Sequence, residues 1–241
     1  MSKVQITIDG KKVEADEGEN LLDICRREFI PIPTLCDHND LKPYGVCRLC
    51  IVEWDRGDWS KIVTSCNFPV KDGQVFKTNS EKVQRQRRMV MELTLARSSQ
   101  TPEVIDVAKR IGVDVGKVRF PKKDEGCILC GMCIRACAEV VEANAISFAG
   151  RGPQRKISSP FFDEAGDCIG CGSCAYICPT NYIKMEEDEN YRSFPEWKVK
   201  FEMARCKKCG QKIAPKKQLE FIRKKANLPA DWFDVCINCR P

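Results

Sequence analysis

Apolar and polar residues alternate over residues 4–8, VQITI, which predicts a β-strand with one buried face. DGKK follows it as a hairpin turn, and VEAD returns as a second strand. ENLLDICRREF has its apolar residues at helical spacing and is predicted to be a short helix. That helix cannot extend through Pro31 and Pro33. RLCIVEW and GQVFKT are predicted to be further strands.

Helical patterns dominate the next part of the chain. SEKVQRQRRMVMELTLAR predicts a helix with Ser80 as its N-cap, and its basic run QRQRR is expected to be a solvated face. TPEVIDVAKRI predicts another helix, capped by Thr101 with Pro102 at its first position. Near the end, KVKFEMARCKKCG begins as a strand and PKKQLEFIRKKANL is a helix. The mixture indicates an α+β protein.

The overall composition is that of a globular chain. Its 241 residues allow one large domain or two to three small ones. Hydrophobic residues make up 43% and charged residues 31%, which is neither a disordered nor a membrane balance. No apolar run approaches the ~20 residues of a membrane helix. The N-terminus lacks the apolar core of a signal peptide, so a cytoplasmic location is expected.

Cysteine is the unusual component, with seventeen copies beside one histidine. In a reduced compartment this number argues for metal binding and against disulfides. The formal net charge is +6, which can indicate a nucleic-acid or acidic partner. Thiolate-bound clusters are themselves anionic, however, and four sites at roughly −2 each would cancel that excess. We therefore expect no nucleic-acid binding.

Two segments repeat one cysteine pattern, C-x2-C-x2-C-x3-C, and Pro179 follows the second. In this iron–sulfur pattern the fourth cysteine of each segment binds the other segment's cluster. Three thiolates of a tight loop bind three corners of one cube, and the fourth cysteine is expected to begin a helix that leads to the other cube. Cluster one is thus predicted to take Cys127, Cys130, Cys133 and Cys178, and cluster two Cys168, Cys171, Cys174 and Cys137.

The glycines of these segments are expected to let the loops approach the clusters and to aim N–H groups at sulfur. They are Gly126, Gly131, Gly170 and Gly172. Zinc sites use paired C-x2-C knuckles, so eight cysteines in compact triples indicate iron–sulfur clusters instead. The stretch resembles the bacterial-type ferredoxins with two [4Fe–4S] clusters, except that Ala138 replaces a proline. The long linker FAGRGPQRKISSPFFDEAG is expected on the surface.

Four cysteines in the first third have the spacing C-x10-C-x2-C-x15-C. Plant-type [2Fe–2S] proteins begin with C-x4-C-x2-C instead. With its flanking residues, LLDICRREFIPIPTLCDHNDLKPYGVCRLCIVE is similar to the N-terminal [2Fe–2S] domain of the large iron–sulfur subunit of respiratory complex I and its hydrogenase relatives. The resemblance implies a β-grasp ferredoxin fold, with Cys36, Cys47, Cys50 and Cys66 as ligands of one [2Fe–2S] cluster.

Two further residues lie outside these patterns. Cys25, on the predicted helix, is expected to be a small buried hydrophobic residue. His38 is expected to be an exposed loop residue, since four cysteines already suffice. The complex I relative binds a further cluster through one histidine and three cysteines, but this chain has neither residue type from 67 to 126. That cluster is predicted to be absent.

The tail contains two C-x2-C pairs separated by 26 residues: Cys206, Cys209, Cys236 and Cys239. Paired knuckles suit a tetrahedral Zn2+ ion in a small zinc-ribbon-like unit. A third [4Fe–4S] cluster also fits this spacing. The alternatives differ in consequence, because zinc has no redox chemistry and a cluster would extend an electron path.

Four parts are predicted along the chain. A [2Fe–2S] β-grasp domain covers residues 1–79, and a helical linker covers residues 80–120. A domain with two [4Fe–4S] clusters covers residues 121–195, and the four-cysteine tail covers residues 196–241. We find no dinucleotide-binding glycine motif after a strand, no P-loop and no acid–base set, so no catalytic residue is predicted. The chain is expected to conduct electrons for an enzyme whose active site lies elsewhere.

The order of parts resembles the N-terminal half of the iron–sulfur subunit in NAD-linked [FeFe]-hydrogenases and in complex I, truncated here before any catalytic domain. The resemblance implies a flavin-containing NAD(P)H-binding subunit, a small [2Fe–2S] subunit and soluble ferredoxin as partners. It also implies a hydrogenase, here expected to be of the [NiFe] type. Some of these relatives perform flavin-based electron bifurcation, and that is our expectation for this chain.

Three alternatives stay open. The same chain could serve a formate dehydrogenase or a non-bifurcating NAD-reducing hydrogenase. It could also be a free-standing carrier, although such carriers are usually acidic and this chain carries +6. A zinc-dependent nucleic-acid-binding or scaffold protein would instead be colourless and bind DNA or RNA in a salt-dependent way.

Overall fold

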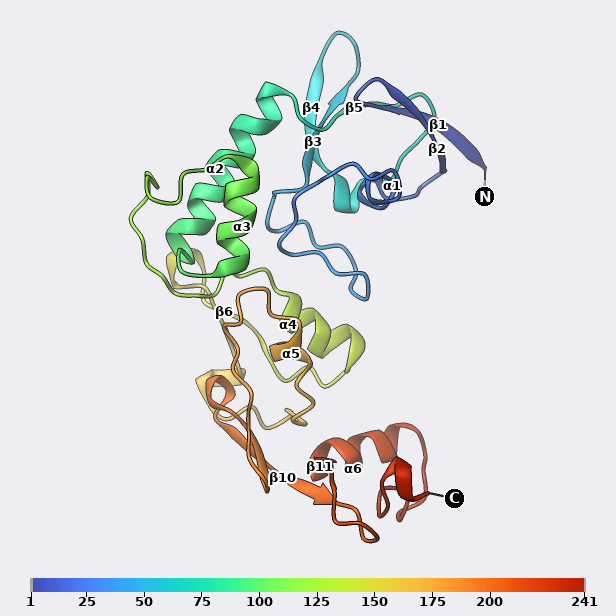
Figure 1. Ribbon diagram of the computed structural model, residues 1–241, viewed down its shortest axis with the longest axis vertical. Coiled ribbons are helices and arrows are strands. Elements are labelled where there is room, and N and C mark those ends of the chain that lie inside the picture. The colour runs from blue at the N-terminus through green and yellow to red at the C-terminus, as the bar shows by residue number, and fades with distance from the viewer. Residues whose placement is uncertain (1, 241) are drawn as a thin grey trace. The chain divides into compact units, whose positions relative to one another are not determined.

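The computed structural model describes residues 2–240. The chain divides into two compact units, Met1–Cys130 and Gly131–Pro241. Each unit contains both helices and strands, so the predicted α+β class is confirmed (Figure 1).

A five-stranded sheet forms the base of the first unit, in the order β2-β1-β5-β3-β4. Its strands are β1 (Lys3–Ile8), β2 (Lys11–Asp16), β3 (Ile51–Asp55), β4 (Ser60–Thr64) and β5 (Val75–Lys77). Strands β1 and β5 are parallel, while the other neighbours are antiparallel. Asp9 and Gly10 both have positive φ at the β1–β2 turn, which is the conformation that an Asp-Gly hairpin adopts.

Helix α1 (Leu21–Arg27) packs its apolar face into the core of this sheet. Val52 and Phe76 are buried in the same core. Cys25 is fully buried there, and burial raises the pKa of its thiol to about 12, as does the negative charge of Asp9. Its prediction as a small buried hydrophobic residue is confirmed.

The two predicted helices after the sheet are α2 (Glu81–Arg97) and α3 (Pro102–Ile111). Ser80 caps α2, because its hydroxyl accepts a hydrogen bond of 3.4 Å from the N–H of Val83. Thr101 precedes α3 but makes no capping bond with its side chain. Both helices contribute to a second core.

Leu35 and Leu49 join that second core from the loop before β3. Met91 and Leu95 of α2 pack against them, with Val104 of α3. This packing ties the cysteine-bearing loop to α2 and α3.

A second sheet, of four antiparallel strands in the order β11-β10-β9-β8, organises the second unit. Its strands are β8 (Glu186–Glu187), β9 (Tyr191–Phe194), β10 (Val199–Arg205) and β11 (Lys212–Pro215). The predicted surface linker forms a small hairpin of β6 (Ser147–Ala149) and β7 (Lys156–Ser158). Phe161 beyond it is 93% exposed, which agrees with a surface position.

Short helices follow each cysteine loop of the second unit: α4 (Met132–Arg135) and α5 (Ser173–Tyr176). The expectation that the fourth cysteine begins a helix is wrong. Each helix begins one residue before the third cysteine, because a glycine in the left-handed conformation turns the chain immediately before it. Cys137 lies in the π-helical turn Ala136–Val140, and Cys178 lies beyond the end of α5, before Pro179.

Helix α6 (Lys216–Lys225) lies where the sequence predicts it, with Leu219 buried. Across residues 2–240, no helix is both long enough and apolar enough to cross a membrane.

Candidate metal centres

The structure brings together the four cysteines predicted to bind the [2Fe–2S] cluster. Cys36 and Cys47 lie in the loop before β3, and Cys50 directly precedes that strand. Cys66 lies in the short turn Ser65–Asn67 after β4. Cys47 is half-buried and the others are buried.

These cysteines form two pairs. The N–H of Cys47 donates a hydrogen bond of 3.4 Å to the sulfur of Cys36. A second hydrogen bond, between the two thiols, lowers the pKa of Cys47 and raises that of Cys36. In the other pair, a hydrogen bond with Cys66 lowers the pKa of Cys50 to about 7. A cluster of two irons takes two thiolates on each iron, so this two-plus-two arrangement fits it.

The second pair is held by the turn that carries Cys66. The N–H and the hydroxyl of Ser65 donate hydrogen bonds of 3.0 and 2.8 Å to the carbonyl oxygen of Cys50. Leu22 and Ile32 pack against Cys50 and Cys66. Exclusion of water by these apolar side chains lowers the local dielectric, which affects the potential of any bound cluster.

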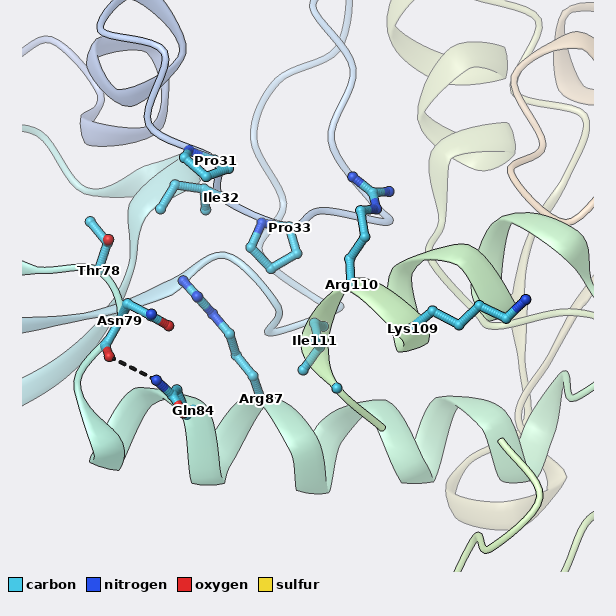
Figure 2. A pocket seen from close by; sticks show the side chains of 11 residues that line it. Pro31, Ile32, Pro33, Thr78, Asn79, Gln84, Arg87, Lys109, Arg110 and Ile111 are labelled. Carbon is cyan, nitrogen blue, oxygen red and sulfur yellow. Dashed lines mark hydrogen bonds between the residues drawn. The ribbon is translucent and has the colours of Figure 1, made fainter. Parts of the chain in front are cut away.

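A buried cation lies beside Cys50. The Arg87 guanidinium donates hydrogen bonds of 3.0 Å to the carbonyl oxygen of Leu49 and 2.6 Å to that of Ile51. Its side chain extends from α2 into a pocket bounded by Pro31–Pro33, Asn79 and the end of α3 (Figure 2). Burial lowers the pKa of Arg87 to about 10, so it remains charged at neutral pH.

This position corrects one expectation. The run QRQRR was predicted to be a solvated face, yet Arg87 within it is only 6% exposed. Its neighbours Arg85 and Arg88 are exposed as expected. His38 lies in a loop with its side chain 39% exposed, and its Nδ1 accepts a hydrogen bond from the N–H of Asp40.

One cavity of the second unit is lined by four cysteines from both segments of the twin motif: Cys137, Cys168, Cys171 and Cys174. These are the four ligands predicted for cluster two. Cys137 comes from the first segment, yet it lines the same cavity as three cysteines of the second segment. Their assignment as the four ligands of one cluster stays a prediction. The aromatic residues Phe194 and Trp197 also line this cavity.

A main-chain hydrogen bond and burial set the environment of the thiols in this cavity. The N–H of Ala145 donates a hydrogen bond of 3.3 Å to the sulfur of Cys137. Burial raises the pKa of Cys137, Cys168 and Cys174, the last to about 12. Without metal these three thiols would therefore be protonated at neutral pH. Bound iron would supply the positive charge that holds them as thiolates.

The glycines of the motif have the predicted backbone. Gly126, Gly131, Gly170 and Gly172 all have positive φ, between 72° and 87°. At Gly170 a Cβ atom would also lie 2.7 Å from the ring of Phe201. Only glycine allows both this turn and this close packing.

The remaining cysteines of the twin motif are divided by the boundary between the units. Cys127 and Cys130 belong to the first unit, Cys133 and Cys178 to the second. The N–H of Leu129 donates a hydrogen bond of 3.4 Å to the sulfur of Cys127. Their assignment to cluster one stays a prediction from spacing.

The four tail cysteines form the tightest group. The sulfurs of Cys206, Cys209, Cys236 and Cys239 all lie within 4.8 Å of one another. One tetrahedral ion with metal–sulfur bonds of ~2.3 Å holds its sulfurs ~3.8 Å apart. The sulfurs that hold a four-iron cube are farther apart, because each binds a different corner. The spacing therefore suits a single metal ion.

Main-chain hydrogen bonds favour the thiolate form of one of these cysteines, which is the form that binds metal. The N–H of Cys236 donates a hydrogen bond of 3.3 Å to the sulfur of Cys206. With the N–H of Cys209, it lowers the pKa of Cys206 to about 6. Lys207 joins the two knuckles through its N–H to the carbonyl oxygen of Asp234, at 2.8 Å, and through an ion pair with that carboxylate.

Comparison with known families agrees with these groups. Residues 1–81 match the family described as 2Fe-2S iron-sulfur cluster binding domain. Residues 167–212 match the family described as 4Fe-4S dicluster domain. The chain carries both iron–sulfur domains. The dicluster match begins at the second cysteine segment and extends to the first tail knuckle, Cys206 and Cys209.

The curated relatives are subunits of a hydrogenase and of NAD(P)H-linked oxidoreductases. The NADP-reducing hydrogenase subunit HndD of Solidesulfovibrio fructosivorans is 32% identical over 219 residues, covering 78% of this chain and 37% of that protein. The NADPH-Fe(3+) oxidoreductase subunit alpha of Geobacter sulfurreducens is 32% identical over 203 residues, covering 75% and 24%. The mitochondrial NADH-ubiquinone oxidoreductase 78 kDa subunit of Neurospora crassa is 29% identical over 224 residues, covering 83% and 29%.

These relatives confirm the predicted resemblance to hydrogenase and complex I subunits. The chain spans about a quarter to somewhat over a third of their length. A chain in the crystal structure of an NAD+-reducing [NiFe]-hydrogenase in the H2-reduced state has a TM-score of 0.63 with this one. The two are 24% identical, and the match covers 73% of this chain and 84% of the other, which establishes a shared fold.

Proposed function

We propose that this chain is an electron-transfer subunit that passes single electrons along iron–sulfur clusters within an NAD(P)H-linked oxidoreductase complex. The observation that carries this proposal is the cavity lined by Cys137, Cys168, Cys171 and Cys174, because it joins both segments of a ferredoxin motif. The paired thiols of the first unit support it independently. Such clusters supply reversible one-electron transfer when bound.

The first unit would hold one [2Fe–2S] cluster. Cys36 and Cys47 would bind one iron, and Cys50 and Cys66 the other, as the two thiol pairs indicate. The five-stranded sheet with α1 packed into its core supports a β-grasp ferredoxin domain. The predicted parts, ending at residues 79, 120, 195 and 241, remain our division of the chain.

The twin motif would hold two [4Fe–4S] clusters. Cluster two would bind Cys168, Cys171, Cys174 and Cys137, and cluster one Cys127, Cys130, Cys133 and Cys178. Each thiolate would neutralise part of the iron charge, and main-chain N–H groups such as that of Ala145 would raise the cluster potential.

The tail would hold one Zn2+ ion in a zinc-ribbon-like unit. Sulfurs within 4.8 Å of one another favour a single ion over a third [4Fe–4S] cluster. Zinc has no redox chemistry, so this site would stabilise the tail without extending the electron path.

Partners follow from the relatives, which include a subunit of an NADP-reducing hydrogenase. We propose a flavin-containing NAD(P)H-binding subunit, a small [2Fe–2S] subunit and a hydrogenase in one cytoplasmic complex. Soluble ferredoxin and electron bifurcation belong to the same proposal. The relative that is an NADPH-Fe(3+) oxidoreductase subunit favours a second candidate, in which the same chain serves a complex without hydrogenase.

The native complex tests this proposal. We would purify it without oxygen, identify its metals and subunits, and record electron paramagnetic resonance (EPR) spectra after adding NADH or NADPH. A flavin subunit, nickel and cluster reduction by a nicotinamide are expected. Molybdenum or tungsten would support a formate dehydrogenase instead. A chain that migrates alone on gel filtration and is not reduced would contradict the proposal and favour a free-standing carrier.

A further inference from the structure

Trp197 is held rigidly beside the cluster-two cavity. It ends the short turn Pro195–Trp197 between β9 and β10, and its side chain is only 2% exposed. Its carbonyl oxygen accepts a hydrogen bond of 3.1 Å from the N–H of Ala165. Phe194 and Val199 pack in the same core. The indole ring therefore has little freedom to reorient.

The indole N–H of Trp197 has no acceptor among residues 2–240. Its Nε1 atom is buried from solvent, and no atom of that part of the chain completes a hydrogen bond with it. A buried donor without a partner destabilises the folded protein, and such donors are rare in folded proteins. Trp197 lines the cavity together with Cys168 and Cys174. The unpaired donor thus lies where a charged sulfur ligand is expected.

The Cys174 thiol is the protein group that this donor can reach. Trp197 and Cys174 line the same cavity and pack in the same core. Iron is bound by the thiolate form of cysteine, and a thiolate sulfur accepts a stronger hydrogen bond than a neutral thiol does.

We propose that Trp197 donates its indole N–H to a sulfur of cluster two, at the Cys174 thiolate, and thereby raises the reduction potential of that cluster. This inference rests on the proposed function, because it requires a [4Fe–4S] cluster in the cavity. It adds a residue that no cysteine spacing reveals. Trp197 lies 23 residues beyond Cys174 and carries no ligand atom.

The direction of the effect follows from charge. Reduction adds one electron to the cluster and increases the negative charge on its sulfurs. A donor N–H therefore stabilises the reduced state more than the oxidised state. A hydrogen bond to a charged group is strong in both redox states of the cluster. The reduction potential shifts only by the difference between the strength of this bond in the reduced state and in the oxidised state.

The matched variants are Trp197→Phe and Trp232→Phe. Both replace an indole with a phenyl ring in the second unit, but Trp232 is 41% exposed and does not line the cavity. We would titrate the full chain with reductant and follow the cluster-two signal by EPR. That signal is identified by its loss in Cys168→Ala.

Trp197→Phe is expected to lower the equilibrium constant for cluster-two reduction by about threefold to tenfold, tenfold being 59 mV for one electron. Trp232→Phe and the [2Fe–2S] signal should remain at wild-type values. An unchanged cluster-two potential in Trp197→Phe, at wild-type iron content, would overturn the inference.

A second measurement needs no variant to fold. Wild-type protein labelled with indole-15N tryptophan should show a 15N hyperfine coupling to reduced cluster two in pulsed EPR. Absence of that coupling, with the cluster signal present, would overturn the inference and leave the proposed function intact. Absence of any [4Fe–4S] signal in wild-type protein would instead overturn the proposed function itself.

Discussion

The guanidinium of Arg87 donates a hydrogen bond of 2.6 Å to the main-chain oxygen of Ile51. A second bond reaches the oxygen of Leu49, so one buried cation holds both neighbours of Cys50. Through these contacts α2 positions a predicted ligand of the [2Fe–2S] cluster and places a positive charge beside it. A cation close to a cluster favours its reduced, more negative state.

Replacing Arg87 should therefore change both stability and potential. Arg87→Met should lower the free energy of unfolding by about 1–3 kcal/mol, because two buried carbonyl oxygens lose their donor. It should also lower the [2Fe–2S] potential. Arg87→Lys keeps the positive charge but not the two hydrogen bonds of the guanidinium. Its [2Fe–2S] potential should therefore stay closer to the wild-type value than its free energy of unfolding does.

Chemical denaturation and an EPR-monitored redox titration measure the two effects. Arg88→Met is the matched control, since Arg88 lies on the same helix and is exposed. An Arg87→Met variant with a wild-type potential would show that the charge does not act on the cluster.

The crossing of Cys137 predicts an unusual pattern of loss among cysteine variants. Cys137 belongs to the first segment but lines the cavity of Cys168. Cys137→Ala and Cys168→Ala should therefore impair the same [4Fe–4S] signal, and Cys133→Ala the other. EPR spectra of the three reduced variants, with iron counts, decide this. If Cys133→Ala and Cys137→Ala impaired the same [4Fe–4S] signal, the assignment of Cys137 to the cluster of the second segment would be refuted.

The tail site should be separable from the clusters. Cys209→Ser should abolish zinc binding while leaving about ten irons per chain, because the tail sulfurs suit one ion. A chelator that removes zinc should likewise leave the visible absorption of the clusters unchanged. A loss of about four irons in Cys209→Ser would instead identify the tail as a third [4Fe–4S] site.

Cys25 should behave as a core residue and not as a ligand. Cys25→Ala should cost about 1–2 kcal/mol of unfolding free energy and leave iron content unchanged. Because burial and Asp9 raise the folded pKa of Cys25 to about 12, its stabilising contribution is present below its ordinary pKa of 9.0. That contribution is lost as the pH rises from there through about 12.

Denaturation at several alkaline pH values tests this dependence. The stability of Cys25→Ala should fall less steeply than that of wild-type protein in that range. Reduced iron content in Cys25→Ala, with the fold intact, would contradict the structural role.

Local sequence patterns predicted those helices and strands that depend mainly on interactions between residues close in sequence. The alternation in VQITI, the helical spacing around Cys25 and the capping by Ser80 all describe interactions within a few residues. Cysteine spacing likewise identified the groups at Cys137 and Cys206, because ligand geometry restricts the loops between ligands. Strand β4 was missed, since its pairing with β3 fixes it more than its own pattern does.

Arg87 and Trp197 could not be predicted in the same way. A basic run on a helix is usually solvated, and only the position of the loop around Cys50 turns Arg87 inward. In the sequence, strands β8 and β9 lie between Cys174 and Trp197, and the fold brings the two residues to one cavity. Both residues act through tertiary contacts that leave no periodic signal in the sequence.

We propose that this chain holds one [2Fe–2S] and two [4Fe–4S] clusters, with a single zinc ion in its tail. Iron, zinc and acid-labile sulfide per chain, measured on protein purified without oxygen, test this most directly. About ten irons, ten sulfides and one zinc are expected. About fourteen irons without zinc would contradict the tail assignment, and zinc throughout without iron would contradict the electron-transfer function altogether.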